Sequence, residues 1–137
     1  MRLEKRLIKM KKVVIPCSGI GKAFGTVARE ATYLLSDGEY ADRFATICLP
    51  LLMAEDEESK RIVTESEVYT LDGCPKKCAS VLVKHAGGHP VMEIMTPKVL
   101  AENREHKPDT VLDIGSGGQL LANDIVNLIL QKGGSEE

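Results

Sequence analysis

Short runs of β-branched and apolar residues alternate along the chain with segments whose apolar residues recur at helical spacing. The runs at residues 12–16, 43–50, 67–73 and 90–95 predict four strands. Apolar residues at helical spacing predict helices over residues 20–35, 54–66, 75–86 and 118–134. Strands that alternate with helices form parallel sheets linked by right-handed crossovers. We therefore predict an α/β fold, three-layer, with a mainly parallel four-stranded sheet and helices on both faces.

The details of several elements follow from single residues. The acidic residues 55–58 are expected in the first turn of the second helix, where the helix dipole favours them. Pro75 suits the first position of the third helix. Residues 96–109 predict a polar connector, and residues 110–115 predict a further short extended piece.

Length and composition indicate one globular domain. The 137 residues are 43% apolar and 28% charged, which is enough for a single core over residues 13–137. Residues 1–12 form a basic N-terminal extension, interpreted as a solvated arm. A net charge of -2 and 4% aromatic residues argue against nucleic-acid binding. No signal peptide and no long apolar window is visible, so we expect a cytoplasmic protein with no membrane partner.

The four cysteines fall at corresponding places in this pattern. Cys17 directly follows the first predicted strand, and Cys48 lies near the end of the second. Cys74 follows the third strand, and Cys78 lies in the first turn of the next helix. Because neighbouring parallel strands lie about 4.8 Å apart, thiols at their carboxyl ends can converge. Zinc needs each sulfur about 2.3 Å away, a distance that loops and side chains can close. The sequence therefore predicts a four-cysteine metal site.

The local chemistry supports this hypothesis. Four cysteines in a reducing compartment point toward metal or redox chemistry rather than structural disulfides. Metal ligands must be thiolates, and the free N–H groups of helix N-termini near Cys17, Cys74 and Cys78 favour that form. Lys22, Lys76 and Lys77 add positive charge that would screen the site.

The stretch "DGCPKKC", together with the upstream "PCSGIG" and "CLP", resembles the DGC-domain family, which is named for its Asp-Gly-Cys motif. The resemblance extends from about Val13 to the final helix. It implies a zinc-binding domain in which Asp72, Gly73 and Cys74 form the name motif. Four potential chelating cysteines are described for the family, and here they correspond to Cys17, Cys48, Cys74 and Cys78. The resemblance brings no established reaction with it.

Three functions fit these cysteines. The first is a closed zinc site, which is structural and can present a surface to a protein or small-molecule partner. The second is thiol redox or sulfur-handling chemistry by Cys74 and Cys78, with Cys17 as an activated nucleophile. The third is an iron–sulfur cluster that transfers electrons. A structural alternative is that a cysteine, above all Cys48, is simply a buried core residue. No catalytic residue is assigned, and the question of an enzyme stays open.

Two glycine-rich motifs are weaker signals. "CSGIGKAFG" looks like a phosphate-binding loop, but it lacks the Walker and dinucleotide spacings. A phosphatase-like cysteine loop would need an arginine, and this segment has none, so its glycines are interpreted as admitting close backbone approach. "VLDIGSGGQLL" looks like a methyltransferase motif, but too little chain follows it.

The remaining titratable residues are interpreted as lying outside the site. His85 and His89 are expected at the edge opposite the cysteines, because the third helix separates them. His106 is interpreted as a solvated residue of the connector. For Glu93 and Asp113, exposed or capping roles are favoured over catalytic ones.

Overall fold

The centre of the molecule is a four-stranded sheet in which every pair of neighbouring strands is parallel. A computed structural model describes residues 12–17 and 21–134, so the predicted basic extension lies outside the described residues except for Lys12. The strand order is β2-β1-β3-β4. The strands are β1 (Lys12–Pro16), β2 (Phe44–Ala45), β3 (Val68–Asp72) and β4 (Met92–Met95). The predicted parallel sheet is confirmed.

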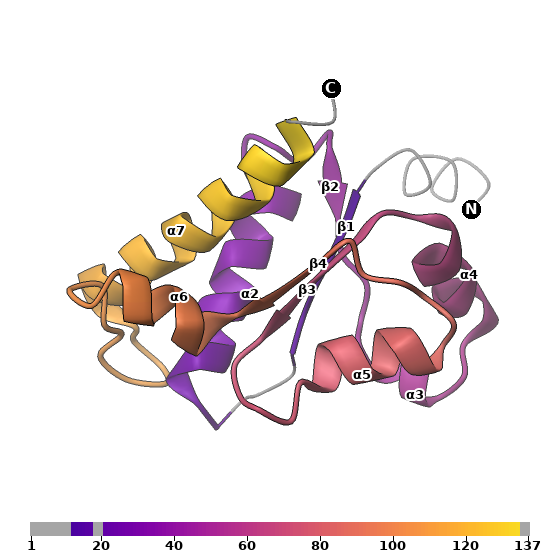
Figure 1. The fold of residues 1–137 in the computed structure, drawn as a ribbon, viewed down its shortest axis with the longest axis horizontal. Helices are drawn as coiled ribbons and strands as arrows, with labels where there is room; N and C mark the ends of the chain where they lie inside the picture. The colour runs from indigo at the N-terminus through magenta and orange to yellow at the C-terminus, as the bar shows by residue number, and fades with distance from the viewer. Residues whose placement is uncertain (1–11, 18–20, 135–137) are drawn as a thin grey trace.

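Helices cover both faces of this sheet, as Figure 1 shows. One face carries α2 (Ala23–Ser36), α6 (Thr96–Glu102) and α7 (Gly115–Gly134). The other carries α3 (Pro50–Met53), α4 (Glu57–Glu65) and α5 (Cys78–His85). The predicted three-layer α/β fold is therefore confirmed.

Side-chain alternation along the strands divides the core between these layers. Val14 and Leu71 belong to the cluster formed with α2, α6 and α7. Val13, Ile15 and Val68 belong to the cluster formed with α3, α4 and α5. Successive residues of a strand point to opposite faces, so a strand buried on both sides needs an almost unbroken apolar run. That requirement explains why β1 and β3 are recognisable in the sequence.

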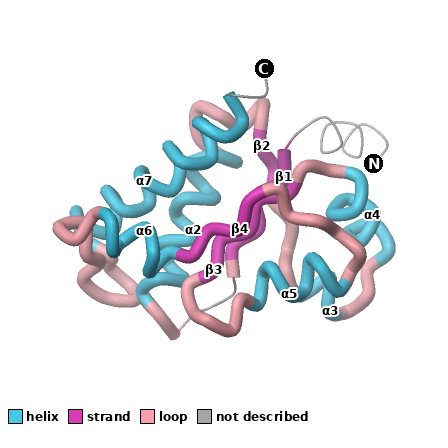
Figure 2. The backbone as a smooth tube through the Cα atoms, viewed as in Figure 1, coloured by secondary structure: helices cyan, strands magenta, loops and turns pink. Residues whose placement is uncertain are grey.

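The smooth backbone trace in Figure 2 shows how short the strands are beside the loops and helices. β2 is the shortest, because only Phe44 and Ala45 pair with Lys12 and Val13 of β1. The predicted strand over residues 43–50 was therefore too long. The backbone leaves the sheet after Ala45, and Pro50 lies at the start of α3. Proline favours a helix N-terminus and cannot donate to a strand ladder.

Two predictions for residues 96–115 were wrong. The expected connector contains α6, which begins immediately after β4 and has proline in its first turn. The expected extended piece at residues 110–115 is a closed turn. Its backbone bonds run from Asp109 N to Ile114 O, 3.0 Å, and from Thr110 N to Asp113 O, 2.9 Å. These groups bond locally and are not available to a sheet.

Several helix starts also differ from prediction. The third predicted helix begins at Cys78 rather than Pro75, because Lys77 has a φ of 52° in the left-handed region. Pro75 lies instead inside a turn closed by Lys77 N and Cys74 O at 3.1 Å. In α4, Asp56 is the N-cap, and the first turn contains Glu57 and Glu58. The predicted closing helix is confirmed and begins slightly earlier, at Gly115.

Within residues 12–17 and 21–134, no helix is both long and apolar enough to span a bilayer.

The packing of α7 can be tested with two adjacent leucines. Leu121 is fully buried in the core, whereas Leu120 is 47% exposed. Leu121→Ala should lower the free energy of unfolding by about 2–5 kcal/mol, because it leaves a cavity beneath α7. Leu120→Ala should cost about 1 kcal/mol or less. Urea denaturation of the two variants checks this difference, and equal losses would contradict the packing of α7 described above.

Candidate metal centre

All four cysteines lie at the carboxyl edge of the sheet. Cys17 is the first residue after β1, and its N–H donates to the carbonyl of Leu71 at 2.8 Å. Cys48 lies three residues beyond β2, and Cys74 lies two residues beyond β3. Cys78 is the first residue of α5. All four are free cysteines. The predicted placement at one edge follows from the strand order, since β2, β1 and β3 are neighbours.

The cysteines differ in exposure. Cys17 is 7% exposed and belongs to a hydrophobic cluster that includes Leu49 and Ala79. In the sequence, these two residues directly follow Cys48 and Cys78. Cys48 and Cys78 are exposed, and Cys74 is partly buried. The alternative of a buried core residue therefore fails for Cys48, whereas Cys17, for which it was less favoured, is the cysteine that is buried. Its segment has already left the sheet when it reaches Cys48, so the side chain is not packed between layers.

Three of these cysteines line two neighbouring cavities. Cys17 and Cys48 line a cavity of about 440 Å³. Cys78 lines a second cavity of about 370 Å³. Leu49 and Pro50 line both. The segment that carries Cys48 therefore lies between the end of β1 and the start of α5.

The sulfur atoms themselves do not form a complete ligand set in the described conformation. In the ranges 12–17 and 21–134, no three His, Cys, Asp or Glu side chains form a group that could hold a metal ion. The common sheet edge is thus observed, whereas the convergence of four sulfurs around an ion stays a prediction.

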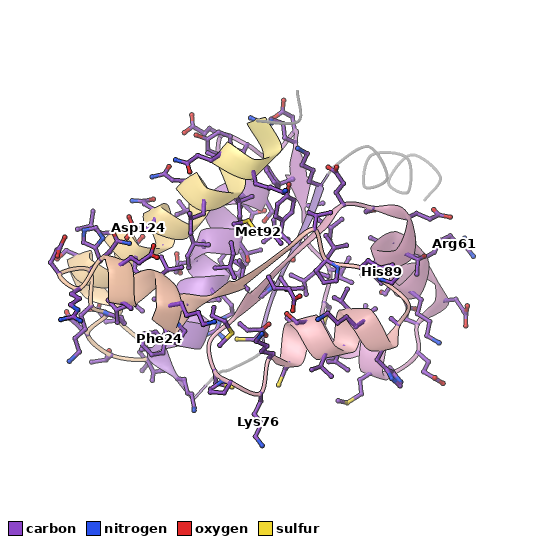
Figure 3. All side chains as sticks on the ribbon, viewed as in Figure 1. Phe24, Arg61, Lys76, His89, Met92 and Asp124 are labelled. Atoms are coloured by element: carbon purple, nitrogen blue, oxygen red, sulfur yellow. The ribbon has the colours of Figure 1, made fainter. Side chains whose placement is uncertain are left out.

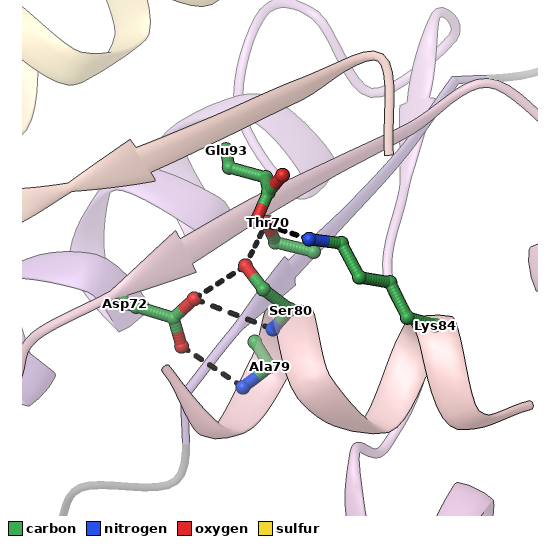
Figure 4. Close-up of polar contacts among 6 residues, drawn as sticks. All are labelled: Thr70, Asp72, Ala79, Ser80, Lys84 and Glu93. Atoms are coloured by element: carbon green, nitrogen blue, oxygen red, sulfur yellow. Dashed lines mark hydrogen bonds and ion pairs between the residues drawn. The ribbon is translucent and has the colours of Figure 1, made fainter. Parts of the chain in front are cut away.

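The carboxyl group of Asp72 joins the end of β3 to the start of α5. One oxygen, Oδ1, accepts a hydrogen bond from Ala79 N at 2.9 Å. The other, Oδ2, accepts from Ser80 N at 3.3 Å and from Ser80 Oγ at 2.7 Å. Figure 4 shows these three contacts. The residue at the N-cap position, Lys77, makes no side-chain cap. Asp72 thus caps α5 from the preceding strand.

This cap corrects one expectation about the thiols. The N–H groups at the start of α5 were expected to favour a thiolate at Cys78. Those of Ala79 and Ser80 instead donate to Asp72. They are therefore already occupied by an oxygen acceptor and do not serve a sulfur.

A polar network extends from this cap across the sheet. Ser80 Oγ is 2.7 Å from Thr70 Oγ1, and both side chains are buried. Separately, at the exposed side of α5, Lys84 Nζ donates to Glu93 Oε1 at 3.1 Å. This hydrogen bond lowers the pKa of Glu93 below its usual value. Glu93 therefore pairs with α5, which is consistent with the non-catalytic role expected for it.

Gly73 allows β3 to end close against the start of α2. A Cβ atom at this position would lie 3.1 Å from Gly25 N and 3.1 Å from the carbonyl carbon of Phe24. Such a contact is tighter than ordinary van der Waals packing, and both atoms belong to backbone that cannot move aside freely. The absence of a side chain at Gly73 therefore permits the approach of α2 to the chain just before Cys74.

A family model described as the DGC domain matches residues 13–114. The chain belongs to the DGC domain family. No curated protein and no solved structure gives a significant match. The DGC match includes all four cysteines and ends just before α7, although α7 supplies fully buried core residues such as Leu121 and Ile125.

The three residues of the DGC motif have separate physical roles in this structure. Asp72 caps α5, and Gly73 permits close approach to α2. Cys74 then begins the turn that leads to Cys78. Cys17 is next to this motif, because Pro16 pairs with Leu71 and the following positions in register are Cys17 and Asp72.

The histidines lie away from the cysteines. His85 is the last residue of α5, and His89 precedes β4, so both lie toward the amino edge of the sheet as predicted. Figure 3 shows His89 near one end of α5 and Lys76 near the other. His106 differs from the expectation of a solvated side chain. Its Nδ1 is 2.6 Å from Asp124 Oδ2, and both side chains are about four-fifths buried.

Sequence reasoning missed an arginine beside Cys17. The loop after β1 contains none, but Arg29 of α2 lines the same cavity as Cys17 and Cys48. Arg29 lies about two turns into α2 and reaches this cavity only because α2 packs back on β1. No local motif could have indicated it.

The same substitution at two helix caps tests the role of Asp72. Asp72→Asn should lower the free energy of unfolding by about 1–3 kcal/mol, because the amide group leaves a buried donor of α5 without an acceptor. Asp56, which caps α4 by accepting from Ser59 N at 2.9 Å, is the matched control. Asp56→Asn should cost about 0.5 kcal/mol or less, since asparagine caps helices as well as aspartate.

Urea denaturation measures the loss of unfolding free energy in both variants. Faster hydrogen exchange at the amides of Ala79 and Ser80 in Asp72→Asn would show that its loss arises in α5. Equal destabilisation by the two variants, with unchanged exchange in α5, would contradict the capping role.

Proposed function

We propose that this protein binds zinc through Cys17, Cys48, Cys74 and Cys78 at the carboxyl edge of its sheet. The observation that most supports this proposal is that three separate segments bring four free cysteines to one edge. Membership in the DGC domain family fits the same conclusion.

The chemistry of the donor set suits zinc. Thiolates are preferred ligands of structural zinc, and four of them complete its tetrahedral shell. Cys17 is the anchored ligand, because its backbone is hydrogen-bonded to β3 and its side chain is packed. Cys48 lies in a segment outside the strand ladder, and Cys74 begins the turn before α5. To complete the ligand set, these two loops and their side chains would have to move so that the other sulfurs meet that of Cys17.

The function of such a site is structural. Zinc with four protein thiolates has no open coordination position for water or substrate, which excludes hydrolytic chemistry at the ion. The ion would instead join the loop after β1, the loop before α3 and the start of α5. Because a metal that binds only the native state stabilises it by mass action, the protein should be markedly more stable with zinc than without it.

Elemental analysis of anaerobically purified protein tests the proposal. The wild-type chain should contain zinc at about one ion per chain, as expected for one tetrahedral site. Each of the variants Cys17→Ser, Cys48→Ser, Cys74→Ser and Cys78→Ser should lose the metal and the stability that depends on it. His89→Asn is the matched control, because it removes a common zinc ligand from the opposite edge. This variant should retain the full zinc content.

Other outcomes would favour the alternative functions. Visible absorbance with stoichiometric iron would indicate an iron–sulfur cluster on the same cysteines. A requirement for Cys74 and Cys78 with tolerance of Cys48→Ser would indicate a redox pair. Rapid labelling of all four thiols in zinc-loaded native protein would also contradict a closed site.

A further inference from the structure

The cavity next to Cys17 is lined by a cationic side chain, that of Arg29, which the proposed zinc site does not require. Its volume of about 440 Å³ lies within the range of roughly 300–1,000 Å³ that is typical of small-molecule sites. Among the described residues that line it, Arg29 is the only charged one, and none is an aspartate or glutamate. When Cys17 and Cys48 are neutral thiols, the described lining has a net positive charge and suits an anion.

The guanidinium of Arg29 is held in place but retains binding capacity. Its Nη2 donates to Thr26 Oγ1 at 3.1 Å. The Thr26 hydroxyl in turn donates to the carbonyl of Val111 at 2.7 Å, in the loop before α7. A guanidinium has five N–H donors in a fixed plane, so the contact with Thr26 leaves most of them available. Among the described residues, no carboxylate forms an ion pair with Arg29.

The rest of the lining indicates the kind of anion. Ile47, Leu49 and Pro50 supply an apolar wall, and the hydroxyl-bearing side chains of Tyr33 and Thr46 also line the cavity. A carboxylate accepts two parallel hydrogen bonds from one guanidinium, which neutralises its single charge. A phosphate dianion needs more positive charge than one arginine provides. The combination of one cation with an apolar wall thus favours a monocarboxylate that has an apolar body.

We propose that this cavity binds a small aliphatic or aromatic monocarboxylate, with Arg29 pairing to the carboxylate and residues 47–50 contacting the apolar body. This site goes beyond the zinc proposal and does not depend on it. Cys17 and Cys48 line the cavity, so a bound carboxylate would lie beside the two thiols or beside the metal that they hold.

Titration of the wild-type protein with 4-methylpentanoate tests the ligand class. Its backbone amide resonances, followed by NMR, should shift saturably in residues 29–33 and 46–49. The neutral amide 4-methylpentanamide has nearly the same shape and should bind about 10- to 100-fold more weakly, because it cannot form charge-assisted hydrogen bonds with Arg29. Equal affinity for the acid and the amide would overturn the proposal, and this comparison needs no variant to fold.

Two matched arginine variants test the role of Arg29. Arg29→Gln should weaken binding of the acid about 10- to 100-fold and leave affinity for the amide unchanged. Arg61 is an exposed arginine of α4, and Figure 3 shows it at the far side of the molecule from Phe24 at the start of α2. Arg61→Gln should bind the acid as the wild type does. Equal binding by all three proteins would overturn the role of Arg29.

Zinc content separates this proposal from the preceding one. Arg29→Gln should retain the zinc content of the wild type while it loses affinity for the acid. Loss of zinc with unchanged acid binding would mean that Arg29 serves the thiolates, which overturns the proposal. Inorganic phosphate that binds more tightly than 4-methylpentanoate at the same residues would overturn the choice of a carboxylate. Acid binding that survives removal of zinc by a chelator would support a site that is independent of the metal.

Discussion

The hydrogen bonds between Asp72 and the first turn of α5 determine how the cysteine edge is built. Asp72 is only 1% exposed, and a buried carboxyl group is costly unless its oxygens have partners. Here the backbone of Ala79, the backbone of Ser80 and the Ser80 hydroxyl provide them. The start of α5 must therefore lie against the end of β3, and the intervening residues must turn sharply between them. This constraint sets the positions of both Cys74 and Cys78.

The parallel sheet extends this local constraint to the other cysteines. Cys17 follows Pro16, which pairs with Leu71, so it lies beside Asp72 at the end of the neighbouring strand. The segment with Cys48 leaves β2 on the other side of β1 and lies between two cavities. The edge thus combines thiols, an arginine and apolar walls within a small region. The proposed zinc ion would bind the sulfur atoms of Cys17 and Cys48, and the proposed carboxylate would bind the guanidinium of Arg29 in the cavity that these two cysteines also line.

Elements buried on both faces were the easiest to predict from the sequence. β1 and β3 are central strands, and their apolar runs are almost continuous. β2 is an edge strand with a two-residue ladder, so the apolar run at residues 43–50 overstated its length. α6 was missed because it is short and Val99 is its only buried apolar residue. The start of α5 was misplaced because Lys77 adopts a left-handed conformation that its residue type does not indicate.

The sequence alone determined the alternation of strands and helices, and with it the edge at which the cysteines lie. The spacing of apolar residues is a property of the local sequence, because each strand or helix must present its own apolar residues to the core. Only the tertiary structure decided which groups meet at that edge. It directs the helix N–H groups to Asp72, brings Arg29 beside Cys17, and pairs His106 with Asp124. These contacts depend on how the layers pack and where the loops turn. Neither can be predicted from the spacing of side chains along the chain.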